Sequence, residues 1–200
     1  MLKPRAFSYG AVALAATLTL SSCAGGSLAT DSASPSAGQT TAAVNSADVT
    51  FAQMMIPHHE QAVRMSDDLL AKDGIDQSVI DLATEIKAAQ EPEITQLKDW
   101  LTAWGEDENS MSGMDGMDGM RGGSDEMMSD DGMMTLEDAS GIEASTVFLE
   151  QMTVHHEGAI AMAQLEIDEG ENADAQAMAT HIVKTQKAEI AVMAELLTSS

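Results

Sequence analysis

Two copies of a Met-x-x-His-His pattern are the part of this sequence best suited to chemistry; they end at His59 and His156. Residues three and four apart lie on one face of a helix, so each methionine would meet both imidazoles that follow it. Thioether and imidazole ligands, without a thiolate, favour soft cations such as Cu(I) or Ag(I). We therefore predict a copper site, with another metal as the alternative cofactor. The predicted ligands are Met55, His58, His59, Met65, Met152, His155, His156 and Met162.

A second set of polar residues follows each histidine pair, on a segment with the same helical periodicity. A carboxylate there could orient an imidazole through its other ring nitrogen, or could bind the metal itself. One alternative is a polar network that only fixes the register of the packed helices. Another is that the histidines are buried core residues hydrogen-bonded to carboxylates. The residues of this second set are Glu85, Gln90, Glu93, His181, Gln186 and Glu189.

An internal duplication supplies both sets. Residues 51–65 and 148–162 are identical at seven of fifteen aligned positions, and residues 83–94 match residues 179–190 in the same order. Apolar residues recur at spacings of three and four in these segments, which is typical of amphipathic helices. The repeating unit is therefore a hairpin of two helices that is used twice.

Four helices follow from this periodicity. The first, of about 26 residues, is expected between Ser46 as its N-cap and Gly74 as its stop, and the others over about 76–101, 142–169 and 173–197. Pro57 and Pro92 lie inside the first two and should kink or restart them, because proline removes an amide donor. Few aromatic residues and short connections favour an all-α fold, an antiparallel four-helix bundle of the ferritin-like type. Residues 46–104 form the first hairpin and residues 135–200 the second, within one domain over 46–200.

Residues 105–134, between the two hairpins, are dominated by glycine, aspartate and methionine. We predict a flexible loop that cannot form a core. Eight methionines without a core to fill suggest additional ligands for a soft ion, and the alternative is a low-complexity insert. These methionines are Met111, Met114, Met117, Met120, Met127, Met128, Met133 and Met134.

The N-terminal residues have the features of an export signal. Lys3 and Arg5 precede an apolar stretch over residues 11–20, and small residues come directly before Cys23, the only cysteine. This arrangement predicts a signal peptide over residues 1–22 and lipidation of Cys23. Residues 23–45, rich in Ala, Ser, Thr and Gly, are expected to form a flexible tether. The sequence therefore predicts a lipid-anchored protein on the extracytoplasmic face of the cell membrane.

The charge of the chain limits its partners. Asp and Glu number 33 against nine Lys and Arg, which gives a formal net charge of -24. Such an acidic surface repels nucleic acid and anionic lipid headgroups, and it attracts cations. The expected partners are a metal ion, the membrane through the lipid anchor, and a copper-handling protein that exchanges the ion.

The doubled motifs also resemble a known family. The pattern F-x3-M-x2-HH-x2-A-x2-M begins at Phe51 and Phe148, and the pattern I-x3-Q-x2-E-I begins at Ile86 and Ile182. Over about residues 46–104 and 133–198 they are similar to the ferritin-like family named domain of unknown function 305, which includes exported copper-binding proteins of the CopM type. The resemblance implies a four-helix bundle that binds copper or silver outside the cytoplasm through the eight ligands named above. The long Met-Gly-Asp insert and Pro92 depart from the family pattern.

Three functions remain open at this point. The leading hypothesis is a non-enzymatic lipoprotein that binds Cu(I) for buffering, resistance or transfer, with an affinity that falls below about pH 6.5 as imidazoles are protonated. The second is a di-metal oxidase or peroxidase, which would use inward Glu-x-x-His motifs, whereas Glu60 and Glu157 are expected to point away from the methionine face. The third is a metal-free structural or adaptor bundle, which requires buried histidines with every polar atom hydrogen-bonded.

Overall fold

The computed structural model describes residues 43–108 and 127–199. It contains five helices in these ranges, which are α1 (Ser46–Leu70), α2 (Gln77–Trp104), α3 (Asp130–Asp138), α4 (Gly141–Glu169) and α5 (Ala173–Ser199). The predicted all-α fold is confirmed. The predicted signal peptide, Cys23 and nearly all of the tether lie outside the described residues.

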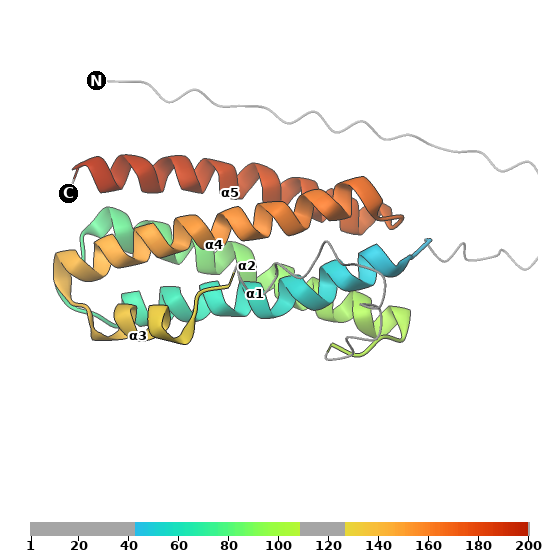
Figure 1. The fold of residues 1–200 in the computed structure, drawn as a ribbon, viewed down its shortest axis with the longest axis horizontal. Helices are drawn as coiled ribbons and strands as arrows, with labels where there is room; N and C mark the ends of the chain where they lie inside the picture. The colour runs from blue at the N-terminus through green and yellow to red at the C-terminus, as the bar shows by residue number, and fades with distance from the viewer. Residues whose placement is uncertain (1–42, 109–126, 200) are drawn as a thin grey trace, which may run out of the picture. The chain divides into compact units, whose positions relative to one another are not determined.

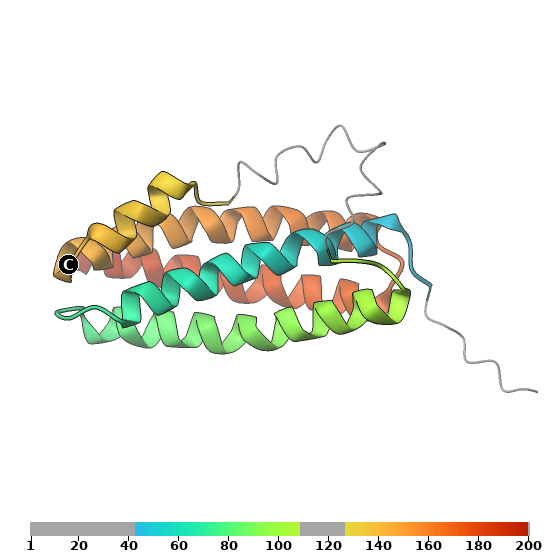
Figure 2. The same ribbon diagram turned by 90° about the horizontal axis from the view of Figure 1, so that it is seen from below.

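The four long helices form an antiparallel bundle made of two hairpins (Figures 1 and 2). α1 pairs with α2, α4 pairs with α5, and α1 packs against α4 at the interface of the hairpins. α2 ends at the opposite end of the bundle from the start of α4 (Figure 2), so the connection between the hairpins has to span the length of the bundle. One long crossover of this kind is characteristic of ferritin-like bundles.

The N-terminus of α1 is fixed by a capping box. Asn45, and not the predicted Ser46, is the N-cap: its side chain accepts hydrogen bonds from the amides of Ala47 and Asp48. In return, the Asp48 carboxylate accepts a hydrogen bond from the backbone amide of Asn45 at 2.6 Å. It also accepts one from the backbone amide of Asn172 at 2.8 Å. Asp48 therefore connects the start of the first hairpin to the turn of the second.

The two internal prolines do not divide their helices. α1 continues through Pro57 and α2 continues through Pro92, so the expected restart of these helices is wrong. Both prolines are exposed. A ring that faces solvent costs the helix one hydrogen bond without disturbing the packed face.

The short helix α3 was not expected, because the whole of residues 105–134 had the composition of a loop. Ser129 caps it by accepting the amide of Gly132, and two aspartates in its first turn complement the helix dipole. α3 packs against α1 and α4, where it buries Leu136 completely. The loop predicted over residues 105–134 therefore ends before residue 130. The last residues of that range belong to α3 and contribute to the core.

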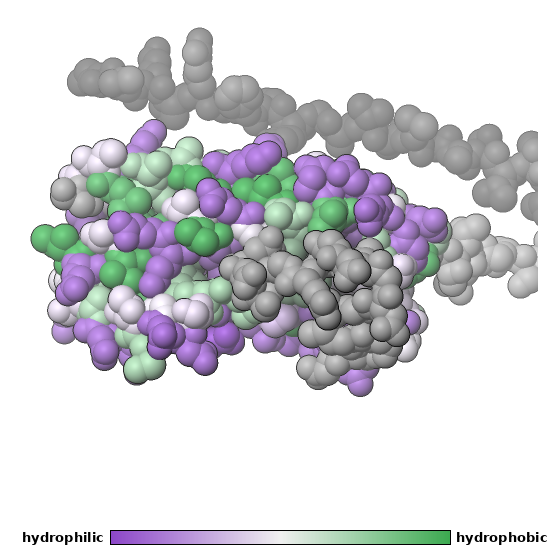
Figure 3. Space-filling view, viewed as in Figure 1, coloured by the Kyte–Doolittle hydropathy of each residue, from purple (hydrophilic) through white to green (hydrophobic). Residues whose placement is uncertain are grey.

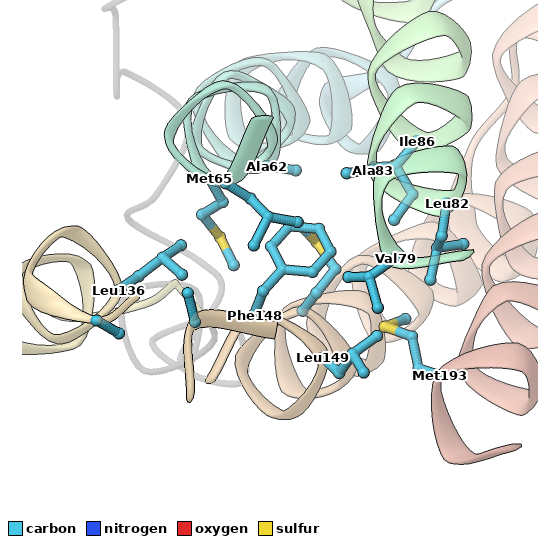
Figure 4. Packing of buried hydrophobic residues seen from close by; sticks show 14 residues of the cluster. Ala62, Met65, Val79, Leu82, Ala83, Ile86, Leu136, Phe148, Leu149 and Met193 are labelled. Atoms are coloured by element: carbon cyan, nitrogen blue, oxygen red, sulfur yellow. The ribbon is translucent and has the colours of Figure 1, made fainter. Parts of the chain in front are cut away.

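Two hydrophobic clusters fill the bundle. The first cluster surrounds the buried ring of Phe148 and includes Met65, Leu149 and, from α3, Leu136 (Figure 4). The second cluster surrounds Phe51 at the other end of α1. Each cluster takes residues from both hairpins, so the hairpins share one interior.

The surface of this domain is mixed in character. On the face shown in Figure 3, hydrophilic residues are interspersed with hydrophobic ones. Within residues 43–108 and 127–199, no helix is long and apolar enough to cross a membrane.

Candidate metal centre

A layer of polar residues, buried or partly buried, separates the two hydrophobic clusters. On α1, the second cluster includes Phe51 and Ile56 and the first begins at Ala62, so His58 and His59 lie between them. The other three long helices change from one cluster to the other in the same way. We call these residues the histidine layer: His58, His59, Gln90, Glu93, His155, His156, Gln186 and Glu189.

The four imidazoles form a row across the interface of α1 and α4. The rings of His58 and His155, from different hairpins, have centroids 3.7 Å apart. Within each pair the ring centroids are 6.5 Å apart, with interplanar angles of 53° in the first hairpin and 54° in the second. These nearly equal values show that the duplicated sequence folds into two equivalent halves related by an approximate two-fold axis.

The outer imidazole of each hairpin is held by a glutamate from the neighbouring helix. His59 Nε2 lies 2.9 Å from Glu93 Oε2, and His156 Nε2 lies 2.7 Å from Glu189 Oε2. A carboxylate accepts hydrogen bonds, so Nε2 carries the proton in a neutral ring and Nδ1 keeps its lone pair. His59 Nδ1 and His156 Nδ1 are buried and have no hydrogen-bond partner among the described residues. Each hairpin therefore presents one oriented imidazole nitrogen to the interior.

Burial also affects the protonation of His155, the inner imidazole of the second hairpin. Desolvation lowers the pKa of His155 well below its usual value of 6.5, and the neighbouring His58, His156 and His59 lower this pKa further. The His155 ring is consequently neutral near pH 7, the state in which an imidazole can bind a metal ion.

The four methionines predicted as ligands are buried on the two sides of the histidine layer. Met55 and Met162 belong to the second hydrophobic cluster, whereas Met65 and Met152 belong to the first. Each side therefore receives one methionine from each hairpin, in keeping with the two-fold axis. Their role as ligands remains a prediction, because the same side chains also fill the core.

Of the second set of predicted residues, four lie in the histidine layer and two do not. Gln90, Glu93, Gln186 and Glu189 lie in the histidine layer, and both amide atoms of Gln90 are buried without a hydrogen-bond partner. Glu85 and His181 are exposed instead. Glu85 is five residues before Gln90, which places it about 140° around the helix from the buried stripe. These two residues do not belong to the buried site.

The methionines of the central segment have different environments. Met111, Met114, Met117 and Met120 lie outside the described residues. Met128 and Met133 pack against the first hydrophobic cluster, which the prediction of a coreless loop did not allow, and Met134 is exposed on α3. Met127 is partly buried.

Two amide side chains beside the histidines were missed by sequence reasoning. Gln61, three residues after His58, exchanges two hydrogen bonds with the backbone of Met128. Gln151, four residues before His155, donates to the carbonyl of Gly132. Their spacing of three or four residues from a histidine could have indicated this position, because residues at that spacing lie on the same face of a helix.

The histidines and carboxylates do not by themselves form a metal site in the described part of the chain. No group of three or more His, Cys, Asp and Glu residues converges there in an arrangement that could hold a metal ion. Glu60 is paired with Lys98, and Glu157 is exposed. Any site in the histidine layer would therefore need a donor of another kind, such as thioether sulfur, to complete its ligand set.

The fold and this layer define a class of protein: a duplicated four-helix bundle with paired histidines across the hairpin interface. The chain belongs to the DUF305 family, the domain of unknown function 305, whose model matches residues 48–197. No protein among those with curated descriptions matches it.

Solved structures with a similar fold include two of the same family. A DUF305 protein from Streptomyces coelicolor is 32% identical, with a TM-score of 0.70 over 76% of this chain and 93% of that one. A DUF305 fragment from Deinococcus radiodurans is 26% identical, with a TM-score of 0.67 over 78% and 99%. CopM in its Cu(I)-bound form is also 26% identical, with a TM-score of 0.61 over 76% and 96%, and CopM has Cu(II)-bound and Ag-bound structures as well.

Proposed function

We propose that this protein binds Cu(I), and its analogue Ag(I), in the histidine layer as a non-enzymatic carrier or buffer of the ion. The observation that carries the proposal is the pair of buried, unpartnered Nδ1 atoms of His59 and His156. Each imidazole is oriented by a carboxylate on its other nitrogen, which is the usual arrangement around a metal-bound histidine. A buried nitrogen without a partner is costly in a metal-free bundle, so this observation counts against a purely structural role.

The ligand chemistry supports a soft monovalent cation. Neutral imidazole nitrogen and thioether sulfur are the donor types near the layer, and both suit Cu(I). The side chains that would complete the set are Met55 and Met162 on one side and Met65 and Met152 on the other. CopM, which shares the fold, has been solved with Cu(I) and with silver, and this similarity supports the same cargo here.

The cellular setting is part of the same proposal. A signal peptide over residues 1–22 and a lipid on Cys23 would place the bundle on the extracytoplasmic face of the membrane. A tether of about twenty residues would let it meet a copper-handling partner near that surface. Labelling cells with a radioactive fatty acid tests the anchor: the Cys23→Ser chain should carry no label and should leave the membrane fraction.

Titration of the full chain with Cu(I), in competition with a chromophoric Cu(I) chelator, tests the site. The double variant H59A/H156A removes both oriented nitrogens, and we expect it to lose tight binding. The variant E93A/E189A leaves the imidazoles but removes their carboxylates, and we expect an affinity lower by about 10- to 100-fold. His181→Ala is the matched control, because this histidine is exposed. Circular dichroism establishes that each variant is folded.

Two results would refute the proposal. One is wild-type protein that does not compete with the chelator for Cu(I). The other is unchanged affinity in folded H59A/H156A protein, which would move the binding away from the histidine layer.

A further inference from the structure

A pocket of about 330 Å³ leads from the surface to the inner imidazole of the second hairpin. Met127, Met128 and Gly132 line it from the segment before and at the start of α3, while Glu150, Val154 and His155 line it from α4. His155 is 1% exposed, and Glu150 is exposed. The pocket therefore joins an acidic surface residue, two thioethers and a buried member of the histidine layer.

The segment that carries the two methionines of this pocket is held in place by hydrogen bonds from side chains of α1 and α4. Gln61 Nε2 donates to the carbonyl of Met128 at 2.9 Å, and the Met128 amide donates to Gln61 Oε1 at 2.8 Å. Gln151 Nε2 donates to the carbonyl of Gly132 at 3.1 Å. One glutamine comes from α1 and the other from α4, so residues 128–132 are attached to both hairpins beside the histidines.

Gly132 gives the Met128 side chain its position. A Cβ at residue 132 would lie 2.6 Å from Met128 Cγ and 3.0 Å from its sulfur. These separations are shorter than ordinary van der Waals contacts. Any larger residue would push the thioether away. The segment is thus shaped around the side chain of Met128, which is one of the residues that line the pocket.

The duplication does not provide this arrangement twice. Gln61 corresponds to Gly158 in the second copy, and Gln151 corresponds to Met54 in the first. Neither equivalent residue has the amide that holds the segment. The pocket is consequently a feature of the His155 side, in a bundle whose histidine layer is otherwise symmetric.

We propose that this pocket is the loading site through which a soft monovalent cation reaches the histidine layer, an inference that rests on the copper binding proposed above. The ion first binds the thioethers of Met127 and Met128 and is then passed to the imidazole of His155. Glu150 at the rim attracts the cation, because a carboxylate raises the local cation concentration. Ligand exchange from sulfur to nitrogen keeps the ion coordinated while it loses water.

The rate of Cu(I) uptake by the full chain tests the loading site. Transfer from a chromophoric Cu(I) complex is followed by absorbance, for wild type and for M127L/M128L, in which leucine keeps the volume but removes sulfur. We expect the uptake and release rates of the variant to fall together, so that the equilibrium affinity is unchanged. Gly132→Ala, which displaces Met128, should also slow uptake. Met134→Leu, on the exposed side of α3, is the matched control.

The outcomes separate this inference from the proposed function. Slow uptake in M127L/M128L with wild-type affinity supports the loading site. Equal rates in M127L/M128L and wild type overturn it while leaving copper binding intact, and so does an equal slowing in Met134→Leu. Wild-type protein that takes up no Cu(I) refutes the proposed function itself. Methionine methyl NMR adds an independent readout: substoichiometric Ag(I) should shift the Met127 and Met128 signals, and signals that do not move would also overturn the loading site.

Discussion

Replacement of Glu166 by glutamine should stabilise the protein near neutral pH. Glu166 lies on α4 and is 1% exposed. Burial, and then the neighbouring Asp48, raise the pKa of Glu166 from 4.5 to about 8. The side chain lies against Gly170, where an added Cβ would collide with the carboxyl, so the substitution must keep its shape. Glutamine has that shape and is neutral at every pH.

The size of the effect follows from the linkage between protonation and folding. The folded chain keeps the Glu166 proton up to about pH 8, whereas the unfolded chain releases it near pH 4.5. The wild type therefore loses stability as pH rises through this window, by about 1.36 kcal/mol for each pH unit. At pH 7 the glutamine variant should be more stable by about 3 kcal/mol. Below pH 4.5 the two proteins should be about equally stable, because both side chains are then neutral.

Urea unfolding followed by circular dichroism, at pH 4, 5.5, 7 and 8, measures the difference between the two proteins. The other acidic groups titrate in both chains, so the difference isolates Glu166. Glu169→Gln, at an exposed position of the same helix, should show no such pH-dependent gain. A difference that is the same at pH 4 and pH 7, or a variant less stable than wild type at pH 7, would refute the reasoning.

Two further predictions concern packing and the central segment. Gln61→Ala removes both hydrogen bonds to Met128, and at about 1 kcal/mol each the Met128 amide should exchange its hydrogen about 30-fold faster; unchanged protection by NMR would contradict this attachment. Phe148→Ala empties the centre of the first cluster and should cost about 3–5 kcal/mol in urea unfolding, whereas Ile142→Ala, at a position 75% exposed, should cost little.

The helices and their pairing were predictable because the signals are local or repeated. Spacings of three and four give the helical faces, and the repeat of the Phe51 segment at Phe148 gives two hairpins. α3 was missed because glycine, aspartate and methionine around it have the composition of a loop. Ser129 followed by two acidic residues was the sequence signal for the start of α3. Burial of the apolar Leu136 side chain then favours the packing of α3 against the bundle.

The members of the histidine layer were predictable from the sequence, but their contacts were not. The sequence placed Glu93 and Glu189 on the same faces as the buried isoleucines, and in the structure both meet histidines. The close contact of the His58 ring with the His155 ring depends on how the two hairpins dock, which no spacing within one hairpin specifies. Glu85 and His181 were included because both can bind metals, although their position around the helix turns them outward.

The two-fold arrangement has a consequence for how the two copies have diverged. At the four pairs of positions that build the histidine layer, both copies have the same residue. At some exposed positions they differ, as Pro57 does from Val154 and Pro92 from Ala188. A change in the layer must suit a partner from the other half, whereas a change on the surface affects only its own half. The duplicated halves have thus remained alike in the histidine layer, while each half contributes one glutamine, Gln61 or Gln151, that attaches the segment before α4 and has no counterpart in the other copy.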